Sequence, residues 1–362
     1  MTGVFSLLHR GVRMTQVLPF FDAVAPVTAP TTSSSTMPTA MPATAEVALP
    51  HIRRRLGQSD LRVFPLAIGG NVFGWTADSG TTNSILDAYA EHDGNFIDTA
   101  DSYAGGRSEI MVGNWMRDKR NRDQVVIATK VGKSADSPGV SARAISHAVN
   151  ASLERLGTDH IDLLYLHIDD QAIPFEETLF AVDDLIRSGK VRYFGASDHS
   201  ANRLIEARVI AAQLSVTPMV AVQNHYNLMH RSDFEGDLAR VAQQQQLGVM
   251  PRFALASGFL SGKYRAKADL GKNGRGNEAA RYLNKRGLRV LAALDVIVAE
   301  QRASGIAAAT VASVSLAWLL TKRDVVAPVA SASNAEQVVD LVTAATLRLG
   351  RHQIAALDRA SA

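Results

Sequence analysis

Short apolar runs alternate with amphipathic stretches along most of the chain, starting near residue 50. The runs are almost continuously hydrophobic and rich in β-branched residues. This pattern is typical of strands in a parallel sheet that is covered on both faces. We predict eight strands, at Val63–Ile68, Phe96–Asp98, Val125–Lys130, Ile161–His167, Val191–Ala196, Val220–Gln223, Gly248–Arg252 and Val325–Pro328.

The stretches between the runs have the period of an α-helix. In the clearest case the apolar side chains recur on one face of a 3.6-residue wheel. This face consists of Phe175, Leu179, Val182, Leu185 and Ile186. The same periodicity predicts three further helices, at 141–156, 201–213 and 234–247. Ser141 is a suitable N-cap for the first of these, and Gly189 is a suitable C-cap after Ile186.

Eight strand–helix units in about 300 residues predict an α/β fold of the (β/α)8, or TIM-barrel, type. The main alternative is a doubly wound open sheet, which usually carries a G-x-G-x-x-G fingerprint after its first strand. The turn at Gly69–Gly74 lacks that spacing, so the barrel is favoured. A charged stretch from Arg53 onward predicts an N-terminal β-hairpin. The segment 253–280 is long and rich in Gly, Lys and Arg, and we expect a functional loop over the barrel top.

Residues 1–50 differ in composition from the rest of the chain. Six of the 12 prolines lie there, and Glu46 is the only charged residue between Ala25 and Pro50. We expect this segment to be disordered, or to result from a start codon assigned too early. A secretory signal is disfavoured, because Asp22 interrupts the apolar run that begins at Val17. The barrel domain is therefore expected to span 51–362.

Composition excludes several classes of function. The chain contains no cysteine, which excludes disulfides, thiolate metal sites and cysteine nucleophiles. Its net charge of +3 gives no support for nucleic-acid binding. No apolar run approaches the roughly 20 residues of a membrane span, so we expect a cytoplasmic protein without a membrane partner. His225 and His230 lack the spacing of metal ligands, and no metal site is predicted.

Polar residues stand where several predicted strands end. Asp98, Lys130, His167 and Gln223 each close an apolar run, and Tyr103 follows Asp98 in the next loop. Catalytic residues of a (β/α)8 barrel lie at the carboxyl ends of its strands. Each residue alone is more often structural, but their combination on neighbouring strands indicates one shared site.

The four residue types Asp, Tyr, Lys and His have complementary acid–base chemistry. Tyrosine has a reference pKa of about 10, which is too high for an efficient proton donor at neutral pH. A nearby lysine favours the phenolate and lowers that pKa, and a carboxylate keeps the lysine charged. A neutral histidine can orient and polarise a carbonyl oxygen. This set predicts protonation of a carbonyl oxygen while a hydride reaches the carbon.

The motifs around these residues resemble those of the aldo-keto reductase superfamily. They are F-I-D-T-A-D-S-Y-A-G-G-R-S-E, A-T-K, L-L-Y-L-H, R-S-G-K-V-R-Y-F-G-A-S, Q-N-H-Y-N-L, L-A-S-G-F-L-S-G-K-Y and A-S-N-A-E-Q, in this order between Phe96 and Gln337. The resemblance covers about residues 52–350. The pattern is similar to that of bacterial reductases that resemble potassium-channel beta subunits.

The resemblance implies a (β/α)8 barrel with Asp98, Tyr103, Lys130 and His167 as its catalytic tetrad. It also implies a nicotinamide dinucleotide, usually NADPH with NADH as the alternative, which this family binds without a glycine fingerprint. The implied cofactor-binding residues are Gly70, Asn71, Asp98, Ser197, Asp198, Gln223, Arg252, Leu255, Ser257, Lys263, Arg275, Ser331, Ser333 and Gln337.

Those residues divide by the part of the cofactor that the resemblance assigns to them. Ser197, Asp198 and Gln223 match positions that hold the nicotinamide carboxamide. The segment 255–263 matches the loop over the pyrophosphate. The segment 333–337 matches the helix start near the adenosine and its 2′-phosphate, where open amide groups suit an anion.

Three positions depart from the family pattern. Arg252 stands where an aromatic residue often stacks on the nicotinamide, so it could tune the cofactor or contact an acidic substrate, or have no effect. Asp198 replaces a common amide. Leu341 stands where an asparagine often contacts adenine.

The resulting hypothesis is an NADPH-dependent reductase of a small aldehyde or ketone, with Tyr103 as general acid; alcohol oxidation would use the same residues. The alternative is a cofactor-binding regulatory subunit with little turnover, like the potassium-channel beta subunits. The expected substrate contacts are Trp75, Tyr103, His167 and Tyr226. The sequence leaves the substrate's identity and the oligomeric state open.

Overall fold

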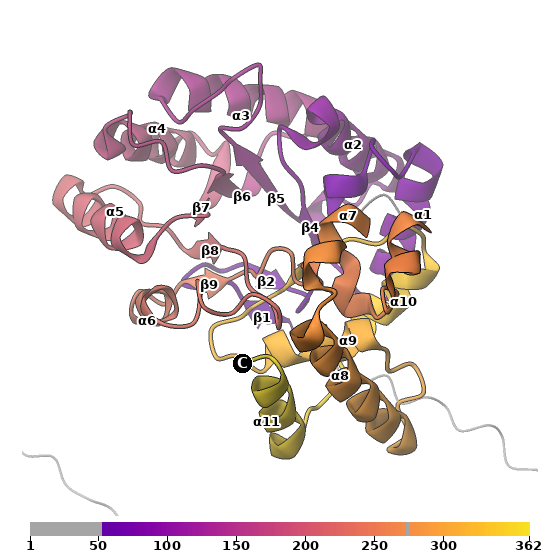
Figure 1. Ribbon diagram of the computed structural model, residues 1–362. Helices are drawn as coiled ribbons and strands as arrows, with labels where there is room; N and C mark the ends of the chain where they lie inside the picture. The colour runs from indigo at the N-terminus through magenta and orange to yellow at the C-terminus, as the bar shows by residue number, and fades with distance from the viewer. Residues whose placement is uncertain (1–52, 273–275) are drawn as a thin grey trace, which may run out of the picture. The chain divides into compact units, whose positions relative to one another are not determined.

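Eight parallel strands form one curled sheet in the computed structural model, which describes residues 53–272 and 276–362 (Figure 1). The strand order is β10-β3-β4-β5-β6-β7-β8-β9. The strands are β3 (Ala67–Gly69), β4 (Phe96–Asp98), β5 (Val126–Val131), β6 (Ile161–Leu166), β7 (Val191–Ser197), β8 (Ala221–Gln223), β9 (Gly248–Val249) and β10 (Val329–Ala330). The expectations for residues 1–50 and for Arg275 lie outside the described residues.

The sheet closes on itself between β9 and the segment that leads into β10. Val249 and Val325 form an isolated parallel bridge. The Val249 amide donates to Asp324 at 2.9 Å, and the Val326 amide donates back to Val249 at 2.9 Å. The predicted (β/α)8 barrel is therefore confirmed.

Helices surround this sheet on its outer side (Figure 1). They are α1 (Ser79–Glu91), α2 (Arg107–Lys119), α3 (Ala142–Leu156), α4 (Phe175–Arg187), α5 (Ala201–Leu214), α6 (Asp237–Gln244), α8 (Lys285–Ala303), α9 (Val311–Leu320), α10 (Glu336–Thr343) and α11 (Arg351–Ala360). Ser141 caps α3 as expected, and Gly189 follows α4 with a φ of 77°. In the described ranges, no helix combines the length and the apolar character that a membrane crossing requires.

Two predicted strands begin later than expected, and proline explains both. The run Val63–Ile68 is split, because Val63 pairs in a separate hairpin and β3 starts only after Pro65. The run Val325–Pro328 precedes β10, which starts directly after the proline. Proline has no amide hydrogen to donate to a ladder, so pairing resumes beyond it.

The predicted helix at 234–247 is also shorter in the structure. It begins only at Asp237, because Gly236 has a φ of 140°, which is outside the helical region.

The predicted N-terminal hairpin is present as β1 (Arg54–Arg55) and β2 (Arg62–Val63), which pair antiparallel. Its apolar side chains Leu56, Leu61 and Val63 are buried with the inward-facing residues of the strands. The barrel interior is thus packed from below, as is usual for this fold.

The segment after β9 is irregular, as expected for a long loop. It contains the short helices η4 (Ala256–Ser261), η5 (Lys267–Lys272), α7 (Gly276–Ala279) and η6 (Ala280–Tyr282). Three residues with side chains, Phe253, Ala256 and Ser257, have a positive φ, which is a strained conformation for them. Strain of this kind is concentrated at functional sites.

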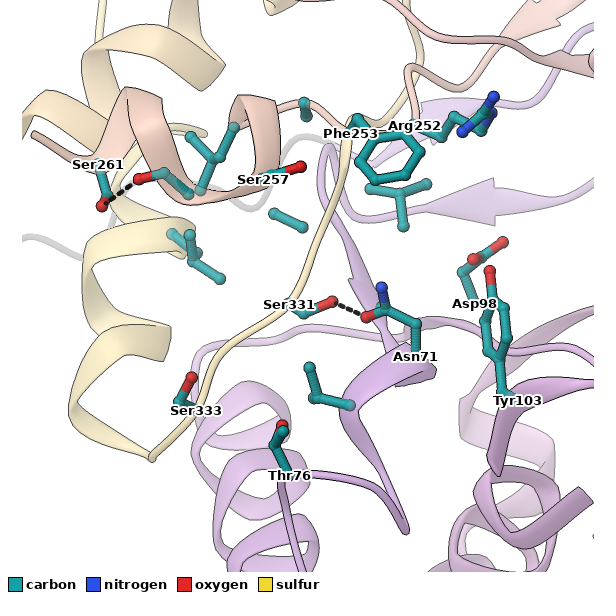
Figure 2. A pocket seen from close by; sticks show the side chains of 18 of the residues that line it. Asn71, Thr76, Asp98, Tyr103, Arg252, Phe253, Ser257, Ser261, Ser331 and Ser333 are labelled. Carbon is teal, nitrogen blue, oxygen red and sulfur yellow. Dashed lines mark hydrogen bonds between the residues drawn. The ribbon is translucent and has the colours of Figure 1, made fainter. Parts of the chain in front are cut away.

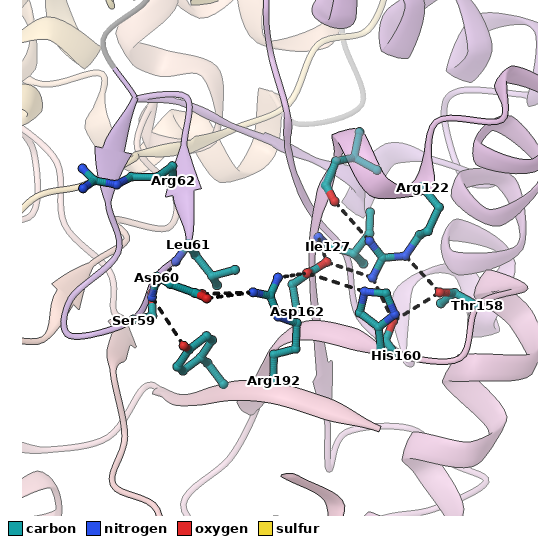
Figure 3. Close-up of polar contacts among 12 residues, drawn as sticks. Ser59, Asp60, Leu61, Arg62, Arg122, Ile127, Thr158, His160, Asp162 and Arg192 are labelled. Atoms are coloured by element: carbon teal, nitrogen blue, oxygen red, sulfur yellow. Dashed lines mark hydrogen bonds and ion pairs between the residues drawn. The ribbon is translucent and has the colours of Figure 1, made fainter. Parts of the chain in front are cut away.

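A buried carboxylate at the start of β6 joins the strands to the hairpin (Figure 3). Asp162 accepts a hydrogen bond from the Ile127 amide at 2.9 Å and pairs with Arg122 at 2.8 Å and with Arg192 at 2.9 Å. Arg192 also pairs with Asp60 of the hairpin at 3.0 Å. Since this network lies at the amino ends of the strands, it serves stability.

The substitution Asp162→Ala should lower the free energy of unfolding by about 3 kcal/mol, because a buried amide and two arginines lose their partner. Thermal unfolding followed by circular dichroism should show a Tm lower by roughly 5–10 °C. Asp60→Ala is the matched control, since exposed Asp60 pairs with the same Arg192 and should contribute under about 1 kcal/mol. Equal losses in the two variants would contradict this interpretation.

Candidate active site

The alternation of side chains along parallel strands brings the predicted residues to one place. Phe96, Ala128 and Tyr165 face the barrel interior, where they belong to its buried core. Two residues further along each chain, Asp98, Lys130 and His167 must point to the same side. The register aligns these strands, because Asp98 pairs with Ala128 and Lys130 with Tyr165. At the carboxyl ends of the strands, the apolar core of the barrel interior is therefore followed by a layer of polar side chains.

Lys130 is the centre of this layer and is 1% exposed. Its ammonium donates to Asp98 at 2.6 Å and to the Thr99 carbonyl at 2.8 Å. The other carboxylate oxygen of Asp98 accepts a hydrogen bond from the Gln223 side chain at 2.8 Å. Burial alone would lower the pKa of Lys130, but Asp98 and Tyr103 outweigh it and raise that pKa. The lysine is consequently held in its charged form.

Tyr103 reaches Lys130 because the chain beyond β4 continues to pair with β5. The Asp101 amide donates to the Lys130 carbonyl at 3.0 Å, which carries the following turn over the lysine. There the ammonium of Lys130 donates to the Tyr103 hydroxyl at 3.3 Å and lies 5.0 Å from its ring centre.

Burial decides the net pKa direction of Tyr103. It raises the pKa above the ordinary value, and the positive charge of Lys130 opposes this rise without reversing it. The expected net lowering by lysine is therefore wrong for this geometry, because desolvation of the hydroxyl is the larger effect. Tyr103 is a protonated phenol at neutral pH.

His167 completes the group from the end of β6. Its ring meets the Tyr103 ring edge-on, with 6.1 Å between centres and 80° between planes. Burial, followed by the charges of Lys130, Lys133 and Arg252, lowers the pKa of His167 to about 2. The imidazole is therefore neutral, as its expected role as a hydrogen-bond donor to a carbonyl requires.

These residues lie at one end of a cavity of about 700 Å³. Figure 2 shows Tyr103 and Asp98 at that end, Asn71 and Ser331 in the middle, and Ser261 and Ser333 at the far end. The predicted site residues that line the cavity are Asn71, Trp75, Asp98, Tyr103, His167, Asp198, Gln223, Arg252, Leu255, Ser257, Lys263, Ser331, Ser333 and Gln337. The cavity thus joins the tetrad to most of the expected cofactor positions.

The middle and far end of the cavity are organised by hydrogen bonds between side chains and backbone. Ser331 donates to the Asn71 side chain at 2.5 Å, which links β10 to the turn after β3. Gln337, in the first turn of α10, accepts from the Ser333 amide at 2.9 Å. The N-terminal turn of α10 therefore lines the far end, where an anion is favoured.

Four predicted residues do not line the cavity. Lys130 and Ser197 are buried beneath its wall, and Lys130 contacts Tyr103, which lines the cavity. Gly70 is buried, and a Cβ at this position would lie only 2.7 Å from Ser108 Oγ. The close approach of Ser108 therefore explains why a glycine stands here. Tyr226 is 1% exposed, donates to Glu235 at 2.7 Å and stacks on Phe234. The structure therefore gives Tyr226 a role in the core and not in substrate contact.

The cavity also contains residues that the sequence did not single out. Lys133, Phe253 and Asp340 line it, with Lys133 near His167 and Asp340 on α10. Lys133 stands three residues beyond Lys130, so extending the strand-end rule into the loop would have found it. Asp340 offered no such signal, since its position depends on the packing of α10.

The cavity's donors fit a nicotinamide dinucleotide. Ser257 Oγ and His167 Nδ1 are buried in its wall, and neither has a hydrogen-bond partner within residues 53–272 and 276–362. Buried polar atoms are normally satisfied, so both indicate a polar ligand. Lys263 adds a cation on the covering loop. Over the same ranges, no three His, Cys, Asp or Glu side chains gather as metal ligands would.

An Asp–Lys–Tyr chain with a neutral histidine, set at the carboxyl ends of barrel strands beside a long polar cavity, defines a class of protein. This class is the (β/α)8-barrel oxidoreductases, in which proton transfer comes from side chains and the hydride comes from a dinucleotide.

Comparison with known proteins agrees with this class and narrows it to one family. The sequence pattern of the Aldo/keto reductase family matches residues 65–362. Norsolorinic acid reductase of Aspergillus flavus is 30% identical over 321 residues, which cover 83% of this chain and 78% of the relative. A Saccharomyces cerevisiae protein with the provisional name aryl-alcohol dehydrogenase is 31% identical over 319 residues (82% and 83%). A rice protein with the provisional name voltage-gated potassium channel subunit beta is 33% identical over 298 residues (79% and 89%). The chain belongs to the aldo/keto reductase family.

One further carboxylate stands beside the tetrad. Asp101 is 2% exposed, and the backbone amides of Gly132 and Ser102 approach its carboxylate without the geometry of full hydrogen bonds. Burial, and secondly the negative charge of Glu109, raise the pKa of Asp101 to about 6. A carboxylate whose pKa is raised on folding favours the folded state below its ordinary pKa, and this contribution is lost as the pH rises through about 6.

Asp101→Asn should therefore stabilise the protein relative to the wild type, and more so at pH 8 than at pH 5, because the amide needs no ionisation. Urea unfolding at both pH values measures the difference. Asp118→Asn, an exposed site on α2, is the control for the loss of a surface carboxylate. If the unfolding free energies of Asp101→Asn and the wild type differed by the same amount at both pH values, the raised pKa of Asp101 would be contradicted.

Proposed function

We propose that the protein reduces the carbonyl group of a small aldehyde or ketone to an alcohol, with NADPH as the hydride donor. The observation that carries this proposal is the buried chain Tyr103–Lys130–Asp98, which opens onto a cavity beside His167. A protonated phenol, a fixed positive charge behind it and a neutral imidazole are the groups that a developing alkoxide needs.

Each residue of the tetrad has a separate task in this proposal. Tyr103 donates its proton to the carbonyl oxygen, and Lys130 stabilises the phenolate that remains. Asp98 balances the charge of Lys130 in the barrel interior, where an unpaired ammonium would be costly. His167, neutral and at the cavity wall, orients the carbonyl oxygen toward Tyr103.

The cofactor supplies a hydride from its nicotinamide ring when bound. Gln223 and Asp198 would hold the ring's carboxamide, Ser257 and Lys263 the pyrophosphate, and Ser333 and Gln337 the adenosine end. The N-terminal turn of α10 lies at the adenosine end, where the 2′-phosphate of NADPH would be held, and this supports NADPH over NADH.

The substitution Tyr103→Phe should lower kcat for carbonyl reduction by about 10²- to 10⁴-fold, because the proton donor is removed while the cavity keeps its shape. Oxidation of NADPH and NADH at 340 nm, with aldehydes, ring ketones and keto-sugars as substrates, measures this loss. Tyr193→Phe is the matched control, since that hydroxyl lies beside Asp60 on the hairpin side of the barrel.

Full activity of Tyr103→Phe on every reduced carbonyl would overturn the role of Tyr103. Tight cofactor binding by the wild type without reduction of any carbonyl would favour the regulatory-subunit alternative, which the relatives with channel-subunit names keep in view.

The rates of reduction and of oxidation should depend on pH differently. Reduction needs the phenol, and the raised pKa of Tyr103 keeps it protonated, so kcat for reduction should be flat between about pH 7 and 9. Alcohol oxidation needs the phenolate as base, so its kcat should still rise beyond about pH 10. Rate profiles in both directions test this, and a reduction rate that falls tenfold between pH 7 and 9 would contradict it.

A further inference from the structure

A cluster of charges at the Tyr103 end of the cavity is not used by the tetrad. Arg252 Nε donates to Asp198 at 2.8 Å, and the Lys133 ammonium lies 3.8 Å from the other oxygen of the same carboxylate. One carboxylate thus serves two cations, while Asp98 and Lys130 balance each other below. The cluster of Arg252, Lys133 and Asp198 therefore carries one net positive charge.

The backbone holds this cluster in place. Arg252 continues the pairing of β9, since its amide donates to Asn224 at 3.0 Å and its carbonyl accepts from Tyr226 at 3.4 Å. Asp198 has a φ of 59°, a conformation that is strained for a residue with a side chain. Strain maintained at a cavity wall indicates a functional position.

Both cations face the reacting end of the cavity. Arg252 is drawn on the same side as Tyr103 and Asp98 in Figure 2, away from Ser333. The charges of Lys133 and Arg252 both reach His167, and that of Arg252 reaches Tyr103.

Each cation keeps hydrogen-bonding capacity for a ligand. The Arg252 side chain is 27% exposed, and within the described residues its two terminal nitrogens make no hydrogen bond. The Lys133 side chain is 40% exposed, and its contact with Asp198 at 3.8 Å is longer than a hydrogen bond.

We infer that the substrate is a carbonyl compound that also carries a carboxylate, which Arg252 and Lys133 bind while Tyr103 and His167 hold the carbonyl. This inference rests on the proposed reductase function. The carbonyl carbon gains a hydride from the nicotinamide, and the carbonyl oxygen gains the proton of Tyr103. The carboxylate of the substrate does not react. Phe253 and Trp75, which are 36% and 58% exposed at the same cavity, provide apolar surface for the part between the two groups.

The test compares each formylbenzoate isomer (2-, 3- and 4-) with its methyl ester, which keeps the ring and the aldehyde but has no charge. For the best isomer we expect kcat/KM to exceed that of the ester by about 10-fold or more. The ratio should fall as salt is raised from about 0.05 to 0.5 M, because the cations are partly exposed.

Two substitutions assign the preference to the cluster. Lys133→Gln and Arg252→Gln should each reduce the acid-to-ester ratio several-fold. Lys133→Gln should do so while the ester is still reduced at the wild-type rate. Lys119→Gln and Arg240→Gln are matched controls, since both side chains are exposed, pair with an aspartate and lie on outer helices.

The outcomes separate the two proposals. An acid-to-ester ratio near one in the wild type overturns the inference and leaves the reductase function standing. A ratio that survives both substitutions overturns the assignment to this cluster, and an Arg252→Gln variant that only raises KM for the cofactor assigns that residue to the cofactor. No reduction of any acid or ester overturns both proposals.

Discussion

A charged lysine buried in the barrel interior is the constraint on which the site depends. An ammonium removed from water is costly unless it is paired and fully hydrogen-bonded. Asp98 and the Thr99 carbonyl meet that need at 2.6 and 2.8 Å, and Gln223 fixes the second oxygen of Asp98 from across the barrel. Three strands, β4, β5 and β8, must therefore keep their register for the lysine to stay charged beneath Tyr103, which couples the catalytic group to the fold.

The strand ends could be predicted from the sequence because period and composition suffice for them. Asp98, Lys130 and His167 close apolar runs, and inside–outside alternation places them on one face without any knowledge of distances. The same argument gave the hairpin and the covering loop. It failed where tertiary packing decides: Tyr226 is drawn into the core by Glu235 and Phe234, and the Gly70 backbone makes room for Ser108.

The balance between burial and charge in the site could not be predicted from the sequence either. Lysine lies beside Tyr103 as expected, yet burial outweighs its charge, and the direction of a pKa depends on how much water the fold removes. Arg252 was recognised as unusual, but its pairing with Asp198, and the sharing of that carboxylate with Lys133, depend on three loops meeting in space. The tetrad is neutral as a group and largely buried, whereas the rim above it is charged and half-exposed.

The closure of the barrel has a mechanical consequence. β4, β5 and β6, whose ends carry Asp98, Lys130 and His167, are joined by two continuous ladders, whereas the ring closes at the bridge between Val249 and Val325 and three backbone hydrogen bonds around it. The covering segment leaves the barrel directly after β9, next to that bridge. A movement of the cover would therefore act on a joint of three backbone hydrogen bonds, on the side of the barrel away from β5. The proton donor thus lies on the side of the ring with longer ladders, and the cover leaves from a side with shorter ones.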